Sequence, residues 1–531
     1  MLFNSHVFIL VFLPLVAFGF WVTNRVGARA RRAWLVLVSV FFYGWWYPPH
    51  VLLLLASILA NFALGGRLGR QPSGWLLALG VTLNLGLLGY FKYAGFMAEN
   101  LRWLTGWAPA LGTVVLPLAI SFFTFQQIAY LVDVWRGEAV DYDLVDYALF
   151  VTFFPQLIAG PIVHHAEMMP QFWDDALGRS DRGQDLAVAA VIFFFGLFKK
   201  VILADSVGAW VGPVYDGAAA GQHLTGWEAW GGTLAFAFQV YFDFSGYSDM
   251  AIGSARLFGI RLPLNFDSPY KATSIDDFWR RWHMTLTRLV LDYLYTPLAL
   301  RLARAAVELD LTPSARFPLA TALPLALAFI AVGVWHGAGW TFLLFGALHG
   351  GYMVLNALWR EFRRRRRRRL GLGGQAPSPG PALRWLCRVA TFLAVVFSLA
   401  LFRAKDLSAV GRLYEAMLGL HGFPLPQRYE LMLGPVARAL ARLGVTFAPV
   451  PLLKLKAVAV LPVLLAIVWL APNTQQILAR HSPALGVVPS DGEPRWWEWR
   501  PTWYWALVVG AIAALALLGL TSVDRFIYFQ F

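Results

Sequence analysis

The sequence has little charge and almost no cysteine. Charged residues make up 14% of its 531 residues, and Cys387 is the single cysteine. Soluble globular proteins carry roughly a quarter charged residues, so this composition indicates a chain surrounded mostly by lipid. One cysteine excludes an internal disulfide and every cysteine-rich metal motif. We therefore expect a membrane protein without internal disulfides, in which Cys387 is a packed small side chain.

Several common catalytic and nucleotide-binding motifs are also missing. The sequence contains no Walker A motif, no glycine-rich dinucleotide fingerprint after a strand and no H-E-x-x-H zinc motif. The stretch GYSDM at 246–250 begins like the nucleophile elbow of a hydrolase, but Met250 stands where that motif requires glycine. We therefore reject a hydrolase of that class, and we expect no metal site.

Long apolar segments recur along the whole chain. Hydrophobic residues make up 58% of it, and the mean hydropathy is +0.57. A helix needs about 20 apolar residues to cross a bilayer, and these runs are continuous rather than alternating. We predict an all-α polytopic membrane protein with about eleven transmembrane helices and some re-entrant or interfacial segments. The candidate segments are 7–22, 33–47, 51–65, 75–93, 114–134, 145–162, 186–205, 228–242, 318–335, 340–357, 389–402, 456–471 and 503–521.

The basic residues indicate the topology. The first apolar run lacks a cleavage site and is followed by the arginines of 25–32, which predicts a retained anchor with its N-terminus outside. Seven arginines at 363–369 mark a second cytoplasmic segment beside anionic lipid headgroups. Nucleic-acid binding would require a basic soluble module with exposed aromatics, and none is visible. The expected partner of the positive charge is therefore the bilayer, not nucleic acid.

A composition change divides the chain. The arginine run is followed by LGLGGQAPSPGPAL, a glycine- and proline-rich stretch typical of a linker. We predict an N-terminal membrane body at 1–360, a cytoplasmic linker at 361–383 and C-terminal membrane helices at 384–531. Within the last part, 403–455 is expected on the extracytoplasmic side. Its amphipathic helices suit either the membrane surface or a docked partner, and the sequence does not choose between these.

Polar residues interrupt the apolar stretch QVYFDFSGYSDMAIG. Asp243, Ser245 and Asp249 lie there among apolar and aromatic neighbours. Carboxylates inside such segments generally face the protein interior and are functional candidates. Asp243 and Asp249 are separated by 240° on an ideal helix at about 100° per residue, which argues against a catalytic pair. A structural role is equally well supported.

The segment SIDDFWRRWHMTL carries alternating charge. Arg280 and Arg281 each follow an aspartate by four residues, so each pair is expected to interact on a helix surface. His283 lies seven residues after Asp276 and would share its face. One interpretation is an interfacial helix anchored by two tryptophans, and the other is the mouth of a cavity for an anionic cofactor. Spacing alone favours the interfacial helix.

The stretch GVWHGAGW places His336 between two strongly apolar segments. Gly337 and Gly339 flank it and would let a substrate approach the backbone closely. His349 follows thirteen residues later, about 220° away on a continuous helix at about 100° per residue, so a shared metal site is not expected. For His349 we favour a role in helix packing.

Six blocks together resemble the membrane-bound O-acyltransferase (MBOAT) family, in its bacterial alginate O-acetyltransferase (AlgI type) branch. They are SFFTFQQIAYLVDVWRG, FFPQLIAGPIVHHAEM, YFDFSGYSDMAIG, LPLNFDSPYKATSIDDFWRRWH, WRRWHMTL and VWHGAGWTFLLFGALHG. The resemblance runs from about residue 1 to the C-terminal FIYFQF. One departure is that ALRLARAAVELDLTPSARF follows DYLYTPL where a glycine-rich basic turn is expected, which leaves the binding of the donor less defined.

The resemblance implies a ring of membrane helices around a central tunnel in the bacterial inner membrane. It implies acetyl-CoA as a cytoplasmic acyl donor, an extracytoplasmic polysaccharide such as alginate as acceptor, and an SGNH-like acetyltransferase or polysaccharide-modification complex as partner. It places the two family histidines at His336 and His283. We expect His336 to act as general base, or as a positioning donor, in acetyl transfer. The expected supporting or tunnel-lining residues are Trp335, Asp243, Ser245, Asp249, Arg280 and Arg281.

Two alternatives stay open from the sequence. An MBOAT protein could carry another cargo or acceptor, such as D-alanine to teichoic acid or acetyl to peptidoglycan or cellulose. A transporter would use the interior aspartates and histidines as an ion relay, although no inverted repeat is evident.

Overall fold

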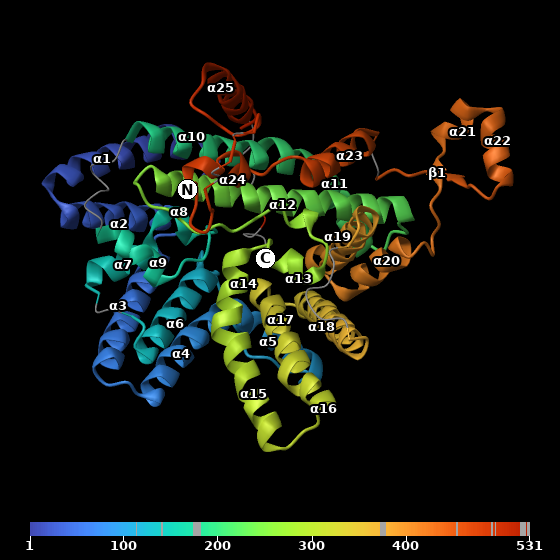
Figure 1. The fold of residues 1–531 in the computed structure, drawn as a ribbon. Coiled ribbons are helices and arrows are strands. Elements are labelled where there is room, and N and C mark those ends of the chain that lie inside the picture. The colour runs from blue at the N-terminus through green and yellow to red at the C-terminus, as the bar shows by residue number, and fades with distance from the viewer. Residues whose placement is uncertain are drawn as a thin grey trace.

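Helices make up almost the whole fold of the computed structural model (Figure 1). Among the described residues, β pairing is limited to a short parallel pair, β1 (Leu425–Pro426) and β2 (Phe447–Ala448), and an isolated bridge between Pro263 and Leu485. The all-α class predicted from the sequence is therefore confirmed. The structure describes residues 1–112, 114–139, 142–173, 182–371, 379–452, 455–489, 492–493, 495–520 and 527.

The N-terminal part alternates α-helices with short π-helical turns, which are labelled η; the same label marks the 3₁₀ turns η5 and η8 further along the chain. Proline opens α3, and the Ser73 hydroxyl caps α4 by accepting a hydrogen bond from the Leu76 amide. The elements are η1 (Phe8–Phe12), α1 (Leu13–Val26), α2 (Ala28–Gly44), α3 (Pro49–Arg70), α4 (Gly74–Leu88), η2 (Gly89–Tyr93), α5 (Ala94–Thr105), α6 (Ile120–Arg136), α7 (Leu144–Thr152), α8 (Phe154–Leu157), α9 (His165–Trp173), α10 (Arg182–Phe198), η4 (Lys199–Ala204) and α11 (Asp205–Ala219).

The remaining elements contain the longest helices of the fold. In chain order they are α12 (Gly226–Arg256), η5 (Pro269–Lys271), α13 (Ile275–Trp279), α14 (Met284–Val290), η6 (Leu291–Tyr295), α15 (Thr296–Glu308), α16 (Pro313–Phe317), η7 (Pro318–Ala322), α17 (Leu323–His336), α18 (Trp340–Arg369), α19 (Pro381–Arg403), α20 (Leu407–Met417), α21 (Arg428–Leu433), α22 (Pro435–Arg442), α23 (Leu455–Leu470), α24 (Thr474–Ile477), η8 (Ala479–His481) and α25 (Trp503–Leu518).

The helix α12 forms the centre of the fold. A capping box starts it, because the Thr225 hydroxyl accepts from the Glu228 amide and the Glu228 carboxylate accepts from the Thr225 amide. From Thr233 onward nearly all of its side chains are buried, and it packs against α10, α11 and α19 (Figure 1). A helix enclosed on all sides needs partners for its polar groups, so its carboxylates are expected to be paired.

The helices α17 and α18 form a tightly packed hairpin. A methyl group on Gly346 would meet the Phe329 carbonyl oxygen at 2.4 Å, and one on Gly337 would meet the Phe342 ring at 2.2 Å. Both positions therefore allow a close approach that a larger residue would prevent. The segment Gly337–Gly339 breaks the helix, so His336 and His349 lie on two antiparallel helices rather than on one continuous helix.

Seven helical segments in the described part of the chain are long and apolar enough to cross a membrane. The chain is thus a multi-pass membrane protein, as predicted. Two shorter apolar helices, 459–470 and 503–518, lie near the C-terminus. The seven segments are Phe8–Val26, Pro49–Arg70, Gly74–Thr105, Gly183–Ala219, Ser314–His336, Trp340–Arg369 and Pro381–Arg403.

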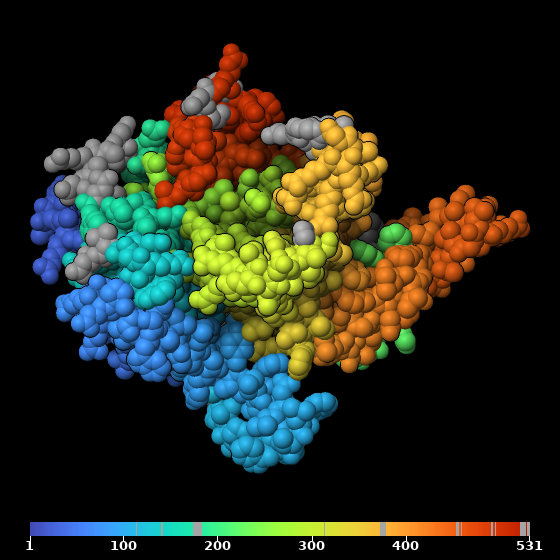
Figure 2. Space-filling model, turned by 60° about the horizontal axis from the view of Figure 1, so that its bottom comes forward, coloured from blue at the N-terminus to red at the C-terminus, as the bar shows by residue number. Residues whose placement is uncertain are grey.

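Arginines gather at one set of helix ends. Arg67 and Arg70 end α3, while Arg304 and Arg316 flank the connection between α15 and α16. The α3–α4 turn and the α15–α16 connection both lie at the bottom of Figure 1. The positive-inside rule favours the cytoplasmic side for a basic end of this kind. On another side, the part around α21 and α22 (orange) projects away from the helices as an arm in Figure 2, whereas α20 packs against α11 and α12.

Candidate active site

His336 is the last residue of α17 and is buried. Lys92 from η2 reaches the end of this helix, where its ammonium donates to the carbonyl oxygens of Trp335 and, at 3.3 Å, of His336. The Tyr93 hydroxyl donates to the Val334 carbonyl at 2.7 Å. The last carbonyls of a helix lack partners within it, and a cation is favoured there. The η2 turn therefore holds the end of α17, and with it His336, in a fixed position.

A small cavity of about 20 Å³ adjoins His336. The ring of Phe402 lies edge-on to His336 with centroids 5.0 Å apart, and the ring of Phe345 lies 6.1 Å away. The cavity has room for about one water-sized group, which requires some 10–15 Å³. His336 thus faces a nearly closed, mostly aromatic space.

His283 is fully buried and caps the start of α14 in a left-handed backbone conformation, with φ of 43°. Its Nδ1 lies 3.0 Å from the Asn265 side-chain oxygen, while the Asn265 amide donates to Ser248. Since that oxygen only accepts, we assign the imidazole proton to Nδ1 and a lone pair to Nε2. Among the described residues, Nε2 has no hydrogen-bond partner.

The indole of Trp335 lies between the two predicted histidines. Its ring centroid is 4.9 Å from that of His336 and 5.8 Å from that of His283. The structure therefore brings these three predicted residues together. It also corrects the interfacial interpretation of this segment, because Trp279, Trp282 and His283 are buried rather than at a membrane surface.

The burial of His283 predicts acid sensitivity. Desolvation lowers the pKa of His283 to about 3 from its ordinary 6.5. The neutral ring therefore contributes its full stability above pH 6.5, and this is lost progressively between pH 6.5 and 3, because the unfolded chain binds the proton first. At pH 5 the loss is on the order of 2 kcal/mol.

The test measures the thermal unfolding midpoint of the detergent-purified protein at pH 7 and at pH 5. The loss of stability appears as the fall in the midpoint between the two pH values. His283→Gln carries no titrating ring, so its midpoint should fall less than that of the wild type. Equal falls in both proteins would show that His283 does not carry the acid sensitivity.

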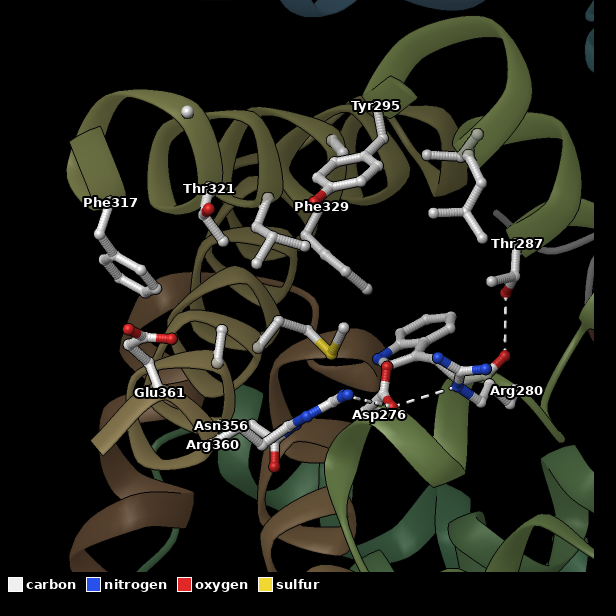
Figure 3. Close-up of a pocket in the computed structure, with 18 of the residues that line it drawn as sticks. Asp276, Arg280, Thr287, Tyr295, Phe317, Thr321, Phe329, Asn356, Arg360 and Glu361 are labelled. Carbon is white, nitrogen blue, oxygen red and sulfur yellow. Dashed lines mark hydrogen bonds and ion pairs between the residues drawn. The ribbon is translucent and has the colours of Figure 1, made fainter. Parts of the chain in front are cut away.

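A wide pocket of about 710 Å³ opens at the arginine-rich end of the α17–α18 hairpin (Figure 3). Asp276 accepts from Arg280 at 3.1 Å and from Arg360 at 3.2 Å. Arg316 and the pair Arg364 and Arg365 complete the basic rim, in which the Arg364 and Arg365 guanidinium groups pair with Glu361. The deeper walls are apolar, and Trp279 lines both this pocket and the small cavity beside His336.

A third cavity of about 160 Å³ lies at the opposite end of α17. Lys92, Trp335 and His336 line it, together with residues of the segment 116–122. His336 therefore borders both this cavity and the small one, which in turn adjoins the wide pocket at Trp279. The three spaces follow one another along α17, with His336 between the second and the third.

His349 also lines the small cavity beside His336. Its Nδ1 accepts from the Trp279 indole at 3.2 Å, and its Nε2 lies 2.8 Å from the Ser398 hydroxyl. The prediction that His336 and His349 point to opposite faces is wrong, because it assumes one continuous helix across Gly337–Gly339. The packing role predicted for His349 agrees with these hydrogen bonds.

The two predicted aspartates are paired with lysines. Asp249 accepts from Lys199 at 2.6 Å, and Asp243 forms an ion pair with Lys200 at 2.8 Å. Neither they nor Ser245 line the cavities described above. They join α12 to η4, which supports the structural alternative for both carboxylates.

The two predicted arginines occupy different places. Arg280 lines the wide pocket and is mostly exposed. Arg281 pairs with Asp277 at 2.6 Å and with Asp267 at 3.4 Å, and it does not line that pocket. Both i,i+4 pairs expected from the sequence are present.

Sequence reasoning missed Lys92. It lies in the predicted span 75–93, and a lysine inside a span is rare enough to be a functional candidate by itself. The stretch YFKY at 90–93 therefore contains a signal that could have identified Lys92. Nothing in the sequence indicates, however, that Lys92 contacts the end of α17.

One polar cluster has the composition of a metal site. The ligand atoms of Asp133, His164 and His165 lie within 4.8 Å of one another. Both histidines and the Tyr293 hydroxyl are within hydrogen-bond distance of one Asp133 oxygen, at 2.6–3.0 Å. Hydrogen bonds account for this arrangement, and the absence of a metal stays a prediction.

The fold and this site define a class of protein, a multi-pass membrane protein that encloses a buried histidine between two cavities. A comparison with family models matches residues 136–376 to MBOAT, the membrane-bound O-acyltransferase family. The peptidoglycan O-acetyltransferase of Helicobacter pylori is 38% identical over 459 residues, covering 80% of this chain and 81% of that protein. The chain therefore belongs to the membrane-bound O-acyltransferase family and is an O-acyltransferase.

Other relatives differ in what their names say they modify. The probable alginate O-acetylase of Pseudomonas aeruginosa is 37% identical over 439 residues, covering 80% of this chain and 76% of that protein. The teichoic acid D-alanyltransferase of Streptococcus thermophilus is 26% identical over 266 residues, covering 49% of this chain and 62% of that protein. The predicted family is confirmed, and the cargo and acceptor are not settled by these names.

Proposed function

We propose that the protein transfers an acetyl group from cytoplasmic acetyl-CoA to a hydroxyl on an extracytoplasmic polysaccharide. The observation that carries the proposal is that His336 lines two cavities, of which the smaller shares Trp279 with the wide pocket. A donor that enters from one end and an acceptor that enters from the other would meet at this ring. His336 is the proposed catalytic base, and His283 and Trp335 support it.

The wide pocket suits a phosphate-bearing thioester. Five arginines and two carboxylates line it in the described part of the chain, so its rim carries net positive charge. Arginine binds phosphate through two parallel hydrogen bonds, and the apolar depth suits an extended acyl-bearing arm. Coenzyme A would place its phosphates at the rim and its thioester near Trp279.

In the proposed reaction one proton is transferred, and a carbon–oxygen bond replaces a carbon–sulfur bond. His336 accepts the proton of the acceptor hydroxyl, and the oxygen attacks the acetyl carbonyl carbon. The carbon–sulfur bond breaks as the carbon–oxygen bond forms, and the proton is returned to the thiolate, which leaves as the free thiol of coenzyme A. General base catalysis of this kind typically contributes 10²–10⁴-fold. The enclosed cavity limits hydrolysis of the thioester by water.

The acceptor is proposed at the level of a class. The relatives act, by their names, on peptidoglycan and alginate, and both polymers carry free hydroxyl groups. Alginate is the acceptor that the resemblance implies, and peptidoglycan as acceptor is supported by the relative that is 38% identical. D-alanyl transfer to teichoic acid has weaker support, since that relative is 26% identical over part of the chain.

The wider arrangement completes the proposal. We infer an inner-membrane protein of about eleven spans that form a ring around a tunnel through His336, with the domain limits predicted above. In a second route, an SGNH-like acetyltransferase or polysaccharide-modification complex outside the membrane receives the acetyl group in place of the polymer and then passes it to the polymer. Acetyl-CoA is a substrate, so no permanently bound cofactor is required.

The test uses purified protein in proteoliposomes supplied with radiolabelled acetyl-CoA on the arginine-rich side. Transfer of label to added polysaccharide or to a partner acetyltransferase supports the proposal. Ion or solute flux without acetyl transfer would instead indicate a transporter. Labelling with D-alanyl donors and not with acetyl-CoA would change the cargo.

Donor binding predicts a separate result. Arg360→Glu reverses one charge at the rim, so the KM for acetyl-CoA should rise about three- to tenfold with little change in kcat, as expected for an exposed charge in water. Arg363→Glu lies on the same helix outside the pocket lining and is the matched control. Equal KM values in the two variants would contradict donor binding at this rim.

A further inference from the structure

The small cavity beside His336 is too narrow for a long acyl chain. Its volume is about 20 Å³, against some 10–15 Å³ for one water-sized group. A methyl group is of that size, and propionyl or butyryl chains add one or two methylenes beyond it. Its wall includes Trp279, His336, His349, Val395, Leu399 and Phe402.

One side of this wall comes from α19. Val395, Leu399 and Phe402 lie on one face of that helix, three or four residues apart, and all three are buried. The family model matches residues 136–376, so α19 lies beyond the matched region. The two histidines and Trp335 lie inside it. The size of the cavity is thus set partly by a helix that the family match does not include.

Hydrogen bonds fix this wall. Ser398 donates to the Val395 carbonyl at 2.7 Å and lies 2.8 Å from Nε2 of His349. His349 in turn holds the Trp279 indole, whose ring packs edge-on against Phe329 with centroids 5.1 Å apart. The chain from Ser398 to Trp279 spans the cavity from α19 to the wall shared with the wide pocket. Moving α19 or Trp279 outward would break these buried hydrogen bonds.

Expansion is also costly because the surroundings are close-packed. Forcing extra methylenes into a packed site typically costs about 1–3 kcal/mol. Since about 1.4 kcal/mol corresponds to a factor of ten, two additional methylenes should slow transfer at least tenfold. A hydrophobic pocket distinguishes two acyl chains that differ by one methylene by a free energy of about 1–3 kcal/mol, which is the same range.

We propose that Val395 and Leu399 of α19 close the cavity beside His336 around a two-carbon acyl group and so determine acyl-chain specificity. The inference rests on the proposed function and adds which acyl donors the site accepts. The acetyl methyl occupies the cavity while the carbonyl carbon faces His336, and bond making and breaking follow the reaction given above. Longer chains are excluded by the α19 face.

The test compares acetyl-, propionyl- and butyryl-CoA as donors in the proteoliposome assay. Wild-type protein should transfer acetyl at least tenfold faster than butyryl. Leu399→Ala should raise the butyryl-to-acetyl rate ratio at least tenfold, because it removes three carbons from the wall. Leu401→Ala is the matched control, since Leu401 is equally buried on the same helix but does not line the cavity.

A second, smaller substitution tests the same wall with less risk to folding. Val395→Ala removes less volume and should raise the propionyl-to-acetyl ratio about three- to tenfold with a smaller cost in stability. An unchanged ratio in a folded Leu399→Ala protein, or the same change in Leu401→Ala, would overturn the role of α19. Equal rates of acetyl and butyryl transfer by the wild-type protein would overturn it as well. A wild-type protein that transfers no acyl group from any donor would instead refute the proposed function.

Discussion

His336→Ala is expected to abolish acyl transfer while leaving the protein in the membrane. The ring is the proposed base, and loss of a general base typically removes 10²–10⁴-fold in rate. The side chain lies at the end of α17, whose carbonyls are held by Lys92 and Tyr93 through backbone contacts that the substitution does not remove. The measurement is the rate of label transfer from acetyl-CoA in proteoliposomes with matched amounts of protein.

The control for this variant is His6→Ala, because His6 is an exposed histidine near the N-terminus. It should retain wild-type transfer. Membrane insertion is checked by extraction and by gel-filtration profile. Transfer near the wild-type rate in a correctly inserted His336→Ala protein would remove His336 from the mechanism.

Lys92→Met is expected to reduce transfer by about ten- to a hundredfold. The substitution keeps the length of the side chain but leaves the carbonyl oxygens of Trp335 and His336 without the lysine donor. Loss of one partner from a buried hydrogen bond costs about 1–3 kcal/mol, and 1.4 kcal/mol corresponds to a factor of ten. The end of α17 would then hold the catalytic ring less firmly, which should be seen mainly in kcat.

Lys92→Arg retains the cation and should recover part of the lost rate. Lys405→Met is the control, because Lys405 lies in an exposed ion pair with Asp216. Thermal stability of each variant is measured alongside the rate. A Lys92→Met protein with wild-type kcat would mean that the cap on α17 does not matter for catalysis.

The sequence is sufficient to predict the fold class and the family, and three of the predicted site residues, His336, His283 and Trp335, lie close together in the structure. Continuous apolar runs predict membrane helices, and the blocks around His336 and His283 point to the family that the comparisons confirm. Both Asp–Arg pairs of the segment 276–281 follow from helical spacing, and both are present. Local patterns of this kind depend only on neighbouring residues.

Spatial neighbours are harder to predict. The angle expected between His336 and His349 holds for one helix, whereas Gly337 and Gly339 end α17 and reverse the chain. The two tryptophans that flank His283 favour a membrane interface, yet burial of both indoles follows from contacts with distant helices. Lys92 meets α17 across more than 240 residues, and no pattern in one sequence indicates such a contact.

The carboxylates of α12 show a related limit. The sequence places Asp243 and Asp249 inside the protein, and both are buried. Their partners Lys200 and Lys199 come from η4, the turn between α10 and α11. Burial of a charge requires a partner, but the sequence does not specify which of the lysines provides it.

The wide pocket has its basic rim on the same side as the arginine-rich helix ends. In the proposed reaction the spent thiol must therefore leave through the opening by which the thioester entered. Donor and product would compete for one rim, so free coenzyme A should inhibit the enzyme. The rate of modification outside the cell would then follow the intracellular ratio of acetyl-CoA to coenzyme A, which ties surface chemistry to carbon metabolism.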